Sequence, residues 1–151
     1  MNDIPLNDIK IEDLREQIAY LGKEPFLVNG TVMENICMGE KIDSEEVKYA
    51  CEKIGLHKDI RRLEKSYNTE IGENGNRLSS GQKQKLALVR VLLQKKSVIL
   101  LDEALSALDV ETKREINKIL QEIKQTRIII FVTHDIESVI VEDIKVTLEQ
   151  A

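Results

Sequence analysis

Unbroken apolar runs along the chain predict the strands of a parallel sheet. Val98–Leu101 and Arg127–Thr133 are apolar over nearly their whole length and rich in β-branched residues. Strands that are buried on both faces of a parallel sheet have this pattern, whereas half-exposed strands alternate. We expect a shorter strand at Ile18–Leu21 and a last strand at Ile144–Leu148.

Between these runs, apolar residues recur every three or four positions, which is typical of helices packed on one side. Val47, Ala50, Cys51 and Ile54 form one such stripe, and this places Cys51 in the core rather than in a reactive site. His57 follows with no evident partner, so we expect it at the surface or in packing. Helices are expected at about 31–36, 44–54, 57–63, 80–93, 110–125 and 136–141. Helices and parallel strands together predict an α/β fold.

The composition argues against several classes of protein and site. The 151 residues suffice for one domain, and the net charge of −5 gives no indication of nucleic-acid binding. Two cysteines without a C-x-x-C pair and two histidines make a structural zinc site improbable and fit a reducing cytosolic compartment. No apolar run approaches the length of a membrane span, and no signal peptide is evident at the start.

Chemistry-bearing residues follow the predicted strands and precede one helix. Ser79 and Gln82 have the spacing of a capping box, and free N–H groups at such a helix start form an anion site. Asp102 and Glu103 end one strand, and His134 ends the next. Because open α/β sheets bind ligands at the carboxyl ends of their strands, we expect these three side chains to lie together if the strands are neighbours.

Several motifs in fixed order resemble those of ATP-binding-cassette (ABC) nucleotide-binding domains. Leu78–Gln82, LSSGQ, resembles the signature motif LSGGQ; Val98–Glu103 resembles the Walker B strand; Ser106–Asp109 matches the D-loop, SALD; and His134 resembles the H-loop histidine. The alternative is a serine-capped helix followed by a strand with solvated acids, but agreement of several motifs in order favours the family.

The resemblance implies a partial P-loop NTPase (RecA-like) parallel sheet with an ABC-type helical subdomain. We expect one partial domain over residues 1–151, with the helical subdomain at about 30–95 and the remaining core in 1–29 and 96–151. By motif position, Asp102 would hold the shell of Mg²⁺, Glu103 would polarise the attacking water, and His134 would contact the γ-phosphate of ATP. The residues assigned to nucleotide binding are Ser79, Ser80, Gly81 and Gln82, which face ATP held by a second domain, with Lys23 and Asp109.

Two residues depart from the family pattern. Lys23 stands where the Q-loop glutamine is expected, and a lysine has no acceptor with which to orient water or ligate magnesium. Lys23 could either contact a phosphate or be a solvated lysine in a loop, and the sequence does not decide between the two. Ser80 stands where glycine is usual, and its side chain adds bulk where ATP approaches closely.

None of the seven glycines begins the phosphate-binding pattern GxxxxGK[ST], with which the family holds its nucleotide. We therefore expect a C-terminal fragment or a truncated domain whose 151 residues alone do not hydrolyse ATP. The missing P-loop strand would also leave strand edges unpaired, and this predicts association or marginal stability.

The expected partners follow from two further segments. Thr69–Gly75 resembles the exporter stretch TEVGERG, which touches transmembrane subunits, and a glycine-rich turn without contacts is the alternative. The apolar residues Phe26–Val28 would either pack against a membrane subunit or be buried in the helical lobe. We expect a second nucleotide-binding domain and an exporter transmembrane subunit as partners, no nucleic acid, and a cytoplasmic location peripheral to the inner face of the membrane.

The resemblance favours part of the ATPase subunit of an ABC exporter, and two other functions remain open from the sequence. One is a non-catalytic module that supplies its signature motif to a complete partner. The other is an ABC-type ATPase of DNA repair or chromosome structure, against which the acidic charge and the exporter-like residues 69–75 both count.

Overall fold

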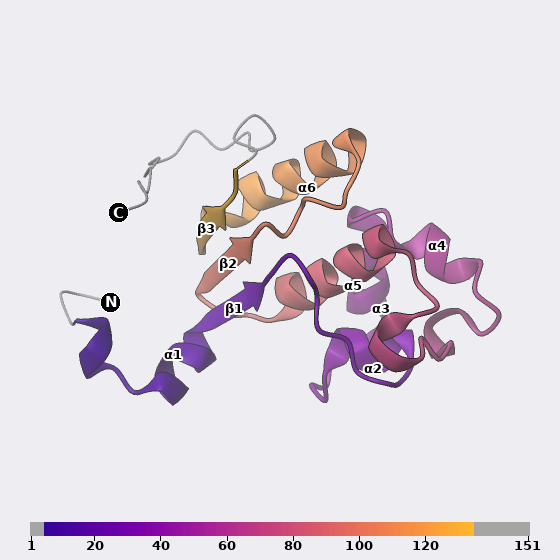
Figure 1. Ribbon diagram of the computed structural model, residues 1–151, viewed down its shortest axis with the longest axis horizontal. Helices are drawn as coiled ribbons and strands as arrows, with labels where there is room; N and C mark the ends of the chain where they lie inside the picture. The colour runs from indigo at the N-terminus through magenta and orange to yellow at the C-terminus, as the bar shows by residue number, and fades with distance from the viewer. Residues whose placement is uncertain (1–4, 135–151) are drawn as a thin grey trace.

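A three-stranded parallel sheet organises the protein, which was analysed as a computed structural model describing residues 5–134. The strand order is β1 (Ile18–Leu21), β2 (Val98–Asp102), β3 (Ile128–Val132), with β2 in the middle (Figure 1). Ile18 pairs with Val98, and Val98 pairs with Ile128, so the three carboxyl ends lie along one edge. The predicted α/β class and these three strands are confirmed. The expected helix at 136–141 and the strand at 144–148 lie outside the described residues.

Only one face of this sheet is well covered by the described helices. Alternate residues point to opposite faces of a strand, and on one face Ala19, Leu21, Ile99 and Leu101 are all buried. They share a core cluster with residues of α5 (Ser80–Leu93) and α6 (Val110–Ile123). The other face is more open, and its exposed apolar side chains are Tyr20, Ile128, Ile130 and Val132.

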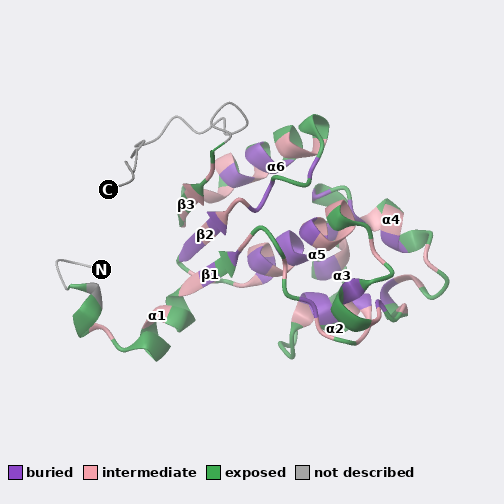
Figure 2. Cartoon of the chain, in the orientation of Figure 1, coloured by how far each residue is buried: buried purple, intermediate pink, exposed green. Residues whose placement is uncertain are grey.

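The helices between β1 and β2 gather around α5. The shorter helices α2 (Val32–Cys37) and α3 (Ser44–Lys53) both pack against α5, and α4 (His57–Arg61) packs against α3. Short 3-10 turns follow at Ser66–Asn68 and Glu73–Gly75. Buried residues concentrate on α5 and on the helix faces turned toward it (Figure 2). These helices fall within residues 30–95, where the sequence predicted a helical subdomain.

Local sequence explains why these helices begin and end where they do. Thr31 caps α2 and forms a capping box with Glu34, while Asp43 caps α3 through the N–H of Glu45. Helix α3 ends before Gly55, whose φ of +70° suits glycine. By contrast, α1 (Ile11–Gln17) has no side-chain cap and no buried residue, and it extends away from the other elements (Figure 2).

The helical region decides between the two expectations for His57, the surface or packing. His57 Nδ1 lies 2.8 Å from the hydroxyl oxygen of Tyr67, a residue that is itself buried, so His57 takes part in packing through a partner that the sequence did not reveal. Tyr67 follows ten positions later, across a helix and a turn. Cys51 is fully buried as predicted, and burial raises the pKa of its thiol to about 11, which makes it unreactive near neutral pH.

Candidate functional site

Two acidic residues lie at the carboxyl end of β2, where the parallel register brings the strand ends together. Asp102 is the last residue of β2 and pairs with Val132 of β3. Its Oδ2 accepts a hydrogen bond of 3.2 Å from the hydroxyl of Tyr20, on β1. Partial desolvation and this bond raise the pKa of Tyr20. The Asp102 carboxylate is therefore fixed from the neighbouring strand and is half-buried.

Glu103 is held by the residues that end β3. Its backbone has a φ of +51°, a left-handed conformation that is uncommon for a residue other than glycine. Its N–H donates to Val132 O at 2.8 Å, and its side-chain Oε1 accepts from the backbone N–H of His134 at 2.9 Å. The same Oε1 lies 2.7 Å from His134 Nδ1. The backbone N–H bond, followed by the imidazole contact, lowers the pKa of Glu103.

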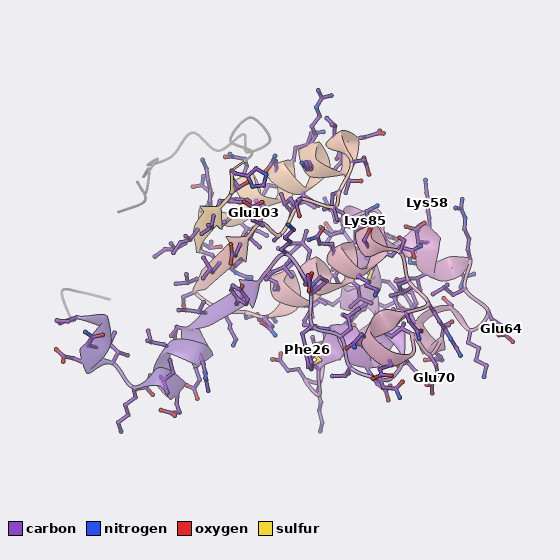
Figure 3. All side chains as sticks on the ribbon, viewed as in Figure 1. Phe26, Lys58, Glu64, Glu70, Lys85 and Glu103 are labelled. Atoms are coloured by element: carbon purple, nitrogen blue, oxygen red, sulfur yellow. The ribbon has the colours of Figure 1, made fainter. Side chains whose placement is uncertain are left out.

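The expected meeting of the two strand ends therefore occurs. Glu103 and His134 are 31 positions apart in the sequence and in hydrogen-bond contact, with Asp102 adjacent in the chain. The Glu103 side chain is 22% exposed, whereas the His134 side chain is 82% exposed. Figure 3 shows Glu103 at the end of β2 nearest α6. This end of the sheet is charged and partly open to solvent.

The turn before α5 forms the capping box that its sequence predicted. Ser79 Oγ accepts from the N–H of Gln82 at 3.2 Å, and Gln82 Oε1 accepts from the N–H of Ser79 at 3.0 Å. The capping box does not use the N–H groups of Ser80 and Gly81, which belong to the first turn of this 14-residue helix. Such amides and the helix dipole favour an anion.

The SALD segment lies against this turn and provides the cap of α6. A Cβ placed on Gly81 would be 3.7 Å from Ala107 O, which is ordinary packing distance. Asp109 accepts from the N–H of Thr112 at 2.9 Å and from the Thr112 hydroxyl at 2.7 Å. The Thr112 N–H bond, followed by the hydroxyl bond, lowers the pKa of Asp109. The sequence reasoning assigned Asp109 to nucleotide binding and missed this capping role, although an aspartate directly before a helical pattern signals it.

Lys23 lies in the loop after β1, and its backbone rather than its ammonium group is tied down. Its side chain is exposed, and its positive charge is one of the smaller influences that lower the pKa of Glu103. Its carbonyl accepts a 3.1 Å hydrogen bond from Nε2 of Gln84, a buried residue of α5. Gln84 Oε1 also accepts from the N–H of Ala107 at 3.1 Å. The sequence reasoning missed Gln84, because neither partner lies near it in the chain.

The donor set fits ATP with magnesium only as part of a larger site. No group of three or more His, Cys, Asp and Glu side chains within residues 5–134 could hold a metal ion. Magnesium needs only one or two carboxylates when phosphate oxygens and waters complete its shell, so Asp102 is a suitable ligand of that kind. The amides before α5 suit a phosphate, and none of the seven glycines of the sequence begins a P-loop.

Comparison with known proteins identifies the family. The model of the ABC transporter family matches residues 1–106, which is more than half of the chain. The chain belongs to the ABC transporter family. The region matched includes β1, α5, β2 and the Asp102–Glu103 pair, so it contains most of the site described above.

Relatives of this ABC transporter chain occur in bacteria and eukaryotes. It is 38% identical over 135 residues to the sublancin-168-processing and transport ATP-binding protein SunT of Bacillus subtilis, covering 89% of the chain and 19% of the relative. It is 38% identical over 141 residues to the leptomycin B resistance protein pmd1 of Schizosaccharomyces pombe, covering 92% of the chain and 10% of the relative. It is 36% identical over 148 residues to human ATP-binding cassette sub-family B member 5, covering 96% of the chain and 12% of the relative.

A solved structure shows the same fold. A bacterial Atm1-family ABC exporter with ATP bound superposes with a TM-score of 0.81 and 30% identity, over 88% of this chain and 24% of that chain. The ABC transporter chain thus spans between a tenth and a quarter of the proteins to which it is compared here. No helix within residues 5–134 combines the length and apolar character needed to cross a bilayer.

Proposed function

We propose that this chain is the signature-bearing part of an exporter ATP-binding domain that couples ATP binding and hydrolysis to transport. The observation that supports it best is the arrangement around α5 and β2. The capped turn at Ser79–Gln82 faces outward as an anion site, and Glu103 and His134 meet at the end of the sheet. Similarity to an exporter structure with ATP bound agrees with this assignment.

The proposed roles follow from the donor at each position. Asp102, held by Tyr20, would ligate a magnesium ion, which when bound neutralises phosphate charge. Glu103 would accept a proton from water, and the lowered pKa keeps it ionised for that task. His134 would orient Glu103 and reach a phosphate oxygen with its other ring nitrogen. The N–H groups of Ser80 and Gly81, which the capping box does not use, and the hydroxyls and amide side chain of Ser79–Gln82, with Asp109 of the neighbouring turn, would bind the nucleotide of a second domain.

An exposed apolar residue supports a transmembrane subunit as the other partner. Phe26 is 68% exposed, whereas Leu27 beside it is buried, so burial in the helical lobe holds for Leu27 and leaves Phe26 available to a partner. Arg90 of α5 donates to Phe26 O at 2.9 Å and to Asn35 O at 2.7 Å, which fixes the loop that presents the ring. Phe26 and Glu70 are both at the periphery of the helical region (Figure 3). An exposed aromatic ring on a fixed backbone is a suitable anchor for a protein partner.

We further propose that the chain acts on the cytoplasmic side, peripheral to the inner face of the membrane. This location would let the helical region with Phe26 meet a transmembrane subunit, while the Ser79–Gln82 turn meets a second nucleotide-binding domain. The proposal treats residues 1–151 as one partial domain, with the helical subdomain at 30–95.

The test is ATP-dependent association through the signature turn. The chain should bind a complete exporter nucleotide-binding domain, made hydrolysis-deficient, in a pull-down with ATP and not without it, because the γ-phosphate joins the two surfaces. Ser79→Ala should weaken binding by roughly tenfold to 150-fold, because one hydrogen bond to a charged group contributes about 1.5–3 kcal/mol. Ser79→Arg should abolish binding through steric overlap.

The matched control is Ser44→Arg, at another exposed serine that begins a helix, α3. This variant should bind as the unaltered chain does. Equal binding without nucleotide, or equal binding by Ser79→Arg, would show that the signature turn does not make the contact.

A non-catalytic module is the second candidate, and one observation favours it. Lys23 replaces the acceptor expected in the Q-loop. Such a module would supply only Ser79–Gln82 to its partner. It would pass the pull-down test, but Glu103→Gln would not alter turnover of the assembled complex.

A further inference from the structure

Gln84 is a buried amide that joins two loops distant in sequence. Only 1% of the residue is exposed, and it lies on the second turn of α5. Its Nε2 donates to Lys23 O and its Oε1 accepts from Ala107 N–H, each at 3.1 Å. The partners are 61 and 23 positions away, so no local structure accounts for either bond.

Both loops border the site at the end of β2. Lys23 follows the last residue of β1 by two positions, and Ala107 lies four positions after Glu103. Ala104 and Leu105 of this turn are buried, whereas Ser106 and Ala107 are exposed, so the bond from Gln84 anchors the outer part of the turn. Gln84 is only two positions after Gln82, the residue that completes the capping box. One side chain therefore links the Lys23 loop to the start of α5 and to the turn before Asp109, and the proposed function assigns the last two segments to nucleotide binding.

An amide is suited to this link for a chemical reason. It offers a donor at one end and an acceptor at the other, whereas a carboxylate lacks the donor and an apolar side chain lacks both. The Gln84 amide is buried and both bonds are partly buried, so the loss of either bond removes a partner from a polar group that water reaches only in part. The spacing of the Lys23 loop and the Ala107 turn is thus set by the position of α5.

We propose that Gln84 is a positioning residue that couples the Lys23 loop to the Ala107 turn and both to the start of α5. Occupation of the Ser79–Gln82 turn by a phosphate then shifts both loops together, which transmits nucleotide binding in one site to Glu103 in the other. Gln84 touches no reacting atom and acts through the two loops. The transmission to Glu103 rests on the proposed function, but the coupling of the loops does not.

The first experiment measures that coupling in the 151-residue chain without nucleotide. Pro25→Gly loosens the Lys23 loop by adding backbone freedom, and amide hydrogen exchange is followed at Ala107 by NMR. In the unaltered chain Pro25→Gly should accelerate exchange of the Ala107 N–H by roughly fivefold. In Gln84→Met, which keeps the length but neither bond, Pro25→Gly should add nothing.

Two further variants separate coupling from loss of stability. Leu88→Ala, at a fully buried position of the same helix, should lower stability yet preserve the response of Ala107 to Pro25→Gly. Gln84→Glu keeps the acceptor for Ala107 N–H and loses the donor to Lys23 O, so it should protect Ala107 while abolishing the response. Gln84→Glu also replaces Gln84→Met as the test variant if Gln84→Met does not fold. An undiminished response in Gln84→Met or in Gln84→Glu would overturn the proposal.

The second experiment adds the hydrolysis-deficient partner domain and ATP. Amide shifts at Ser80 and Gly81 report occupation of the turn, and shifts at Glu24 report transmission. With Gln84→Met the first set should persist and the Glu24 shift should disappear. Absence of shifts at Ser80 and Gly81 in the unaltered chain would refute the proposed function, whereas a retained Glu24 shift in Gln84→Met would refute the transmission.

Discussion

Replacing Asn35 by alanine should cost this protein a large part of its stability. Asn35 is fully buried in α2. Its Nδ2 donates to Val28 O and to Thr31 O, each at 3.0 Å, and its Oδ1 accepts from Val28 N–H at 2.9 Å. The side chain therefore fixes the loop that leads from Phe26 into α2. Alanine removes three hydrogen bonds and introduces no atom to replace them.

The magnitude follows from these bonds and from burial. A hydrogen bond contributes about 0.5–1.5 kcal/mol net, and a buried group left unsatisfied costs about 1–3 kcal/mol. Part of the loss is recovered where Val28 relaxes toward water, so we expect Asn35→Ala to lower the free energy of unfolding by about 2–4 kcal/mol. Small domains have only about 5–15 kcal/mol in total. For about 150 residues, this corresponds to a fall in Tm of roughly 5–15 °C.

Urea unfolding followed by circular dichroism measures the change, with Asn29→Ala as control. Asn29 is exposed and lies between the same two segments, so its replacement should change stability by less than about 0.5 kcal/mol. Asn35→Asp keeps the acceptor for Val28 N–H but loses both donors, and should be at least as destabilising because it buries a charge. A loss below about 1 kcal/mol for Asn35→Ala, or one equal to that of Asn29→Ala, would refute the assigned role.

Three further outcomes are expected. The purified chain should show no steady ATP turnover in a phosphate-release assay, and turnover that Glu103→Gln abolishes would contradict this. Because Ile128, Ile130 and Val132 of the sheet edge are 63%, 45% and 47% exposed, the chain should self-associate in sedimentation runs, and Ile130→Lys should reduce this; a Tm independent of concentration would argue against it. The lowered pKa of Glu103 means that its stabilising effect is present above its ordinary value near 4.5 and lost as pH falls through the folded value. His134→Ala keeps the backbone N–H bond to Glu103 and removes the imidazole contact, so it should partly flatten the acid limb of a stability–pH curve, and an unchanged limb would contradict a contribution from the imidazole.

Much of the fold could be predicted because its strands and caps are local signals. Val98–Asp102 is an unbroken apolar run ending in an acid, and it needs no knowledge of its neighbours to be assigned as a buried strand. The boxes at Thr31 and Ser79 are defined by residues three positions apart. The contact of Glu103 with His134 followed from the same logic, because parallel neighbours end on one edge.

What the sequence could not show is which side chains join distant segments. Gln84 resembles any polar residue of an amphipathic helix until its partners at Lys23 and Ala107 are known. His57 and Tyr67 are likewise ordinary residues until the turn between them brings them to 2.8 Å. These bonds depend on tertiary packing, which overrides the local pattern.

The departure at Lys23 can be understood from how its loop is held. The resemblance led us to ask whether a lysine could do what the expected glutamine does, and the answer by side-chain chemistry is no. The structure fixes the loop through the Lys23 carbonyl, which every residue possesses, and through the amide of Gln84. The path of the loop is therefore independent of the side chain at position 23, which is exposed and free to change. Because its positive charge helps to lower the pKa of Glu103, the replacement alters the electrostatics of the site while leaving its framework in place.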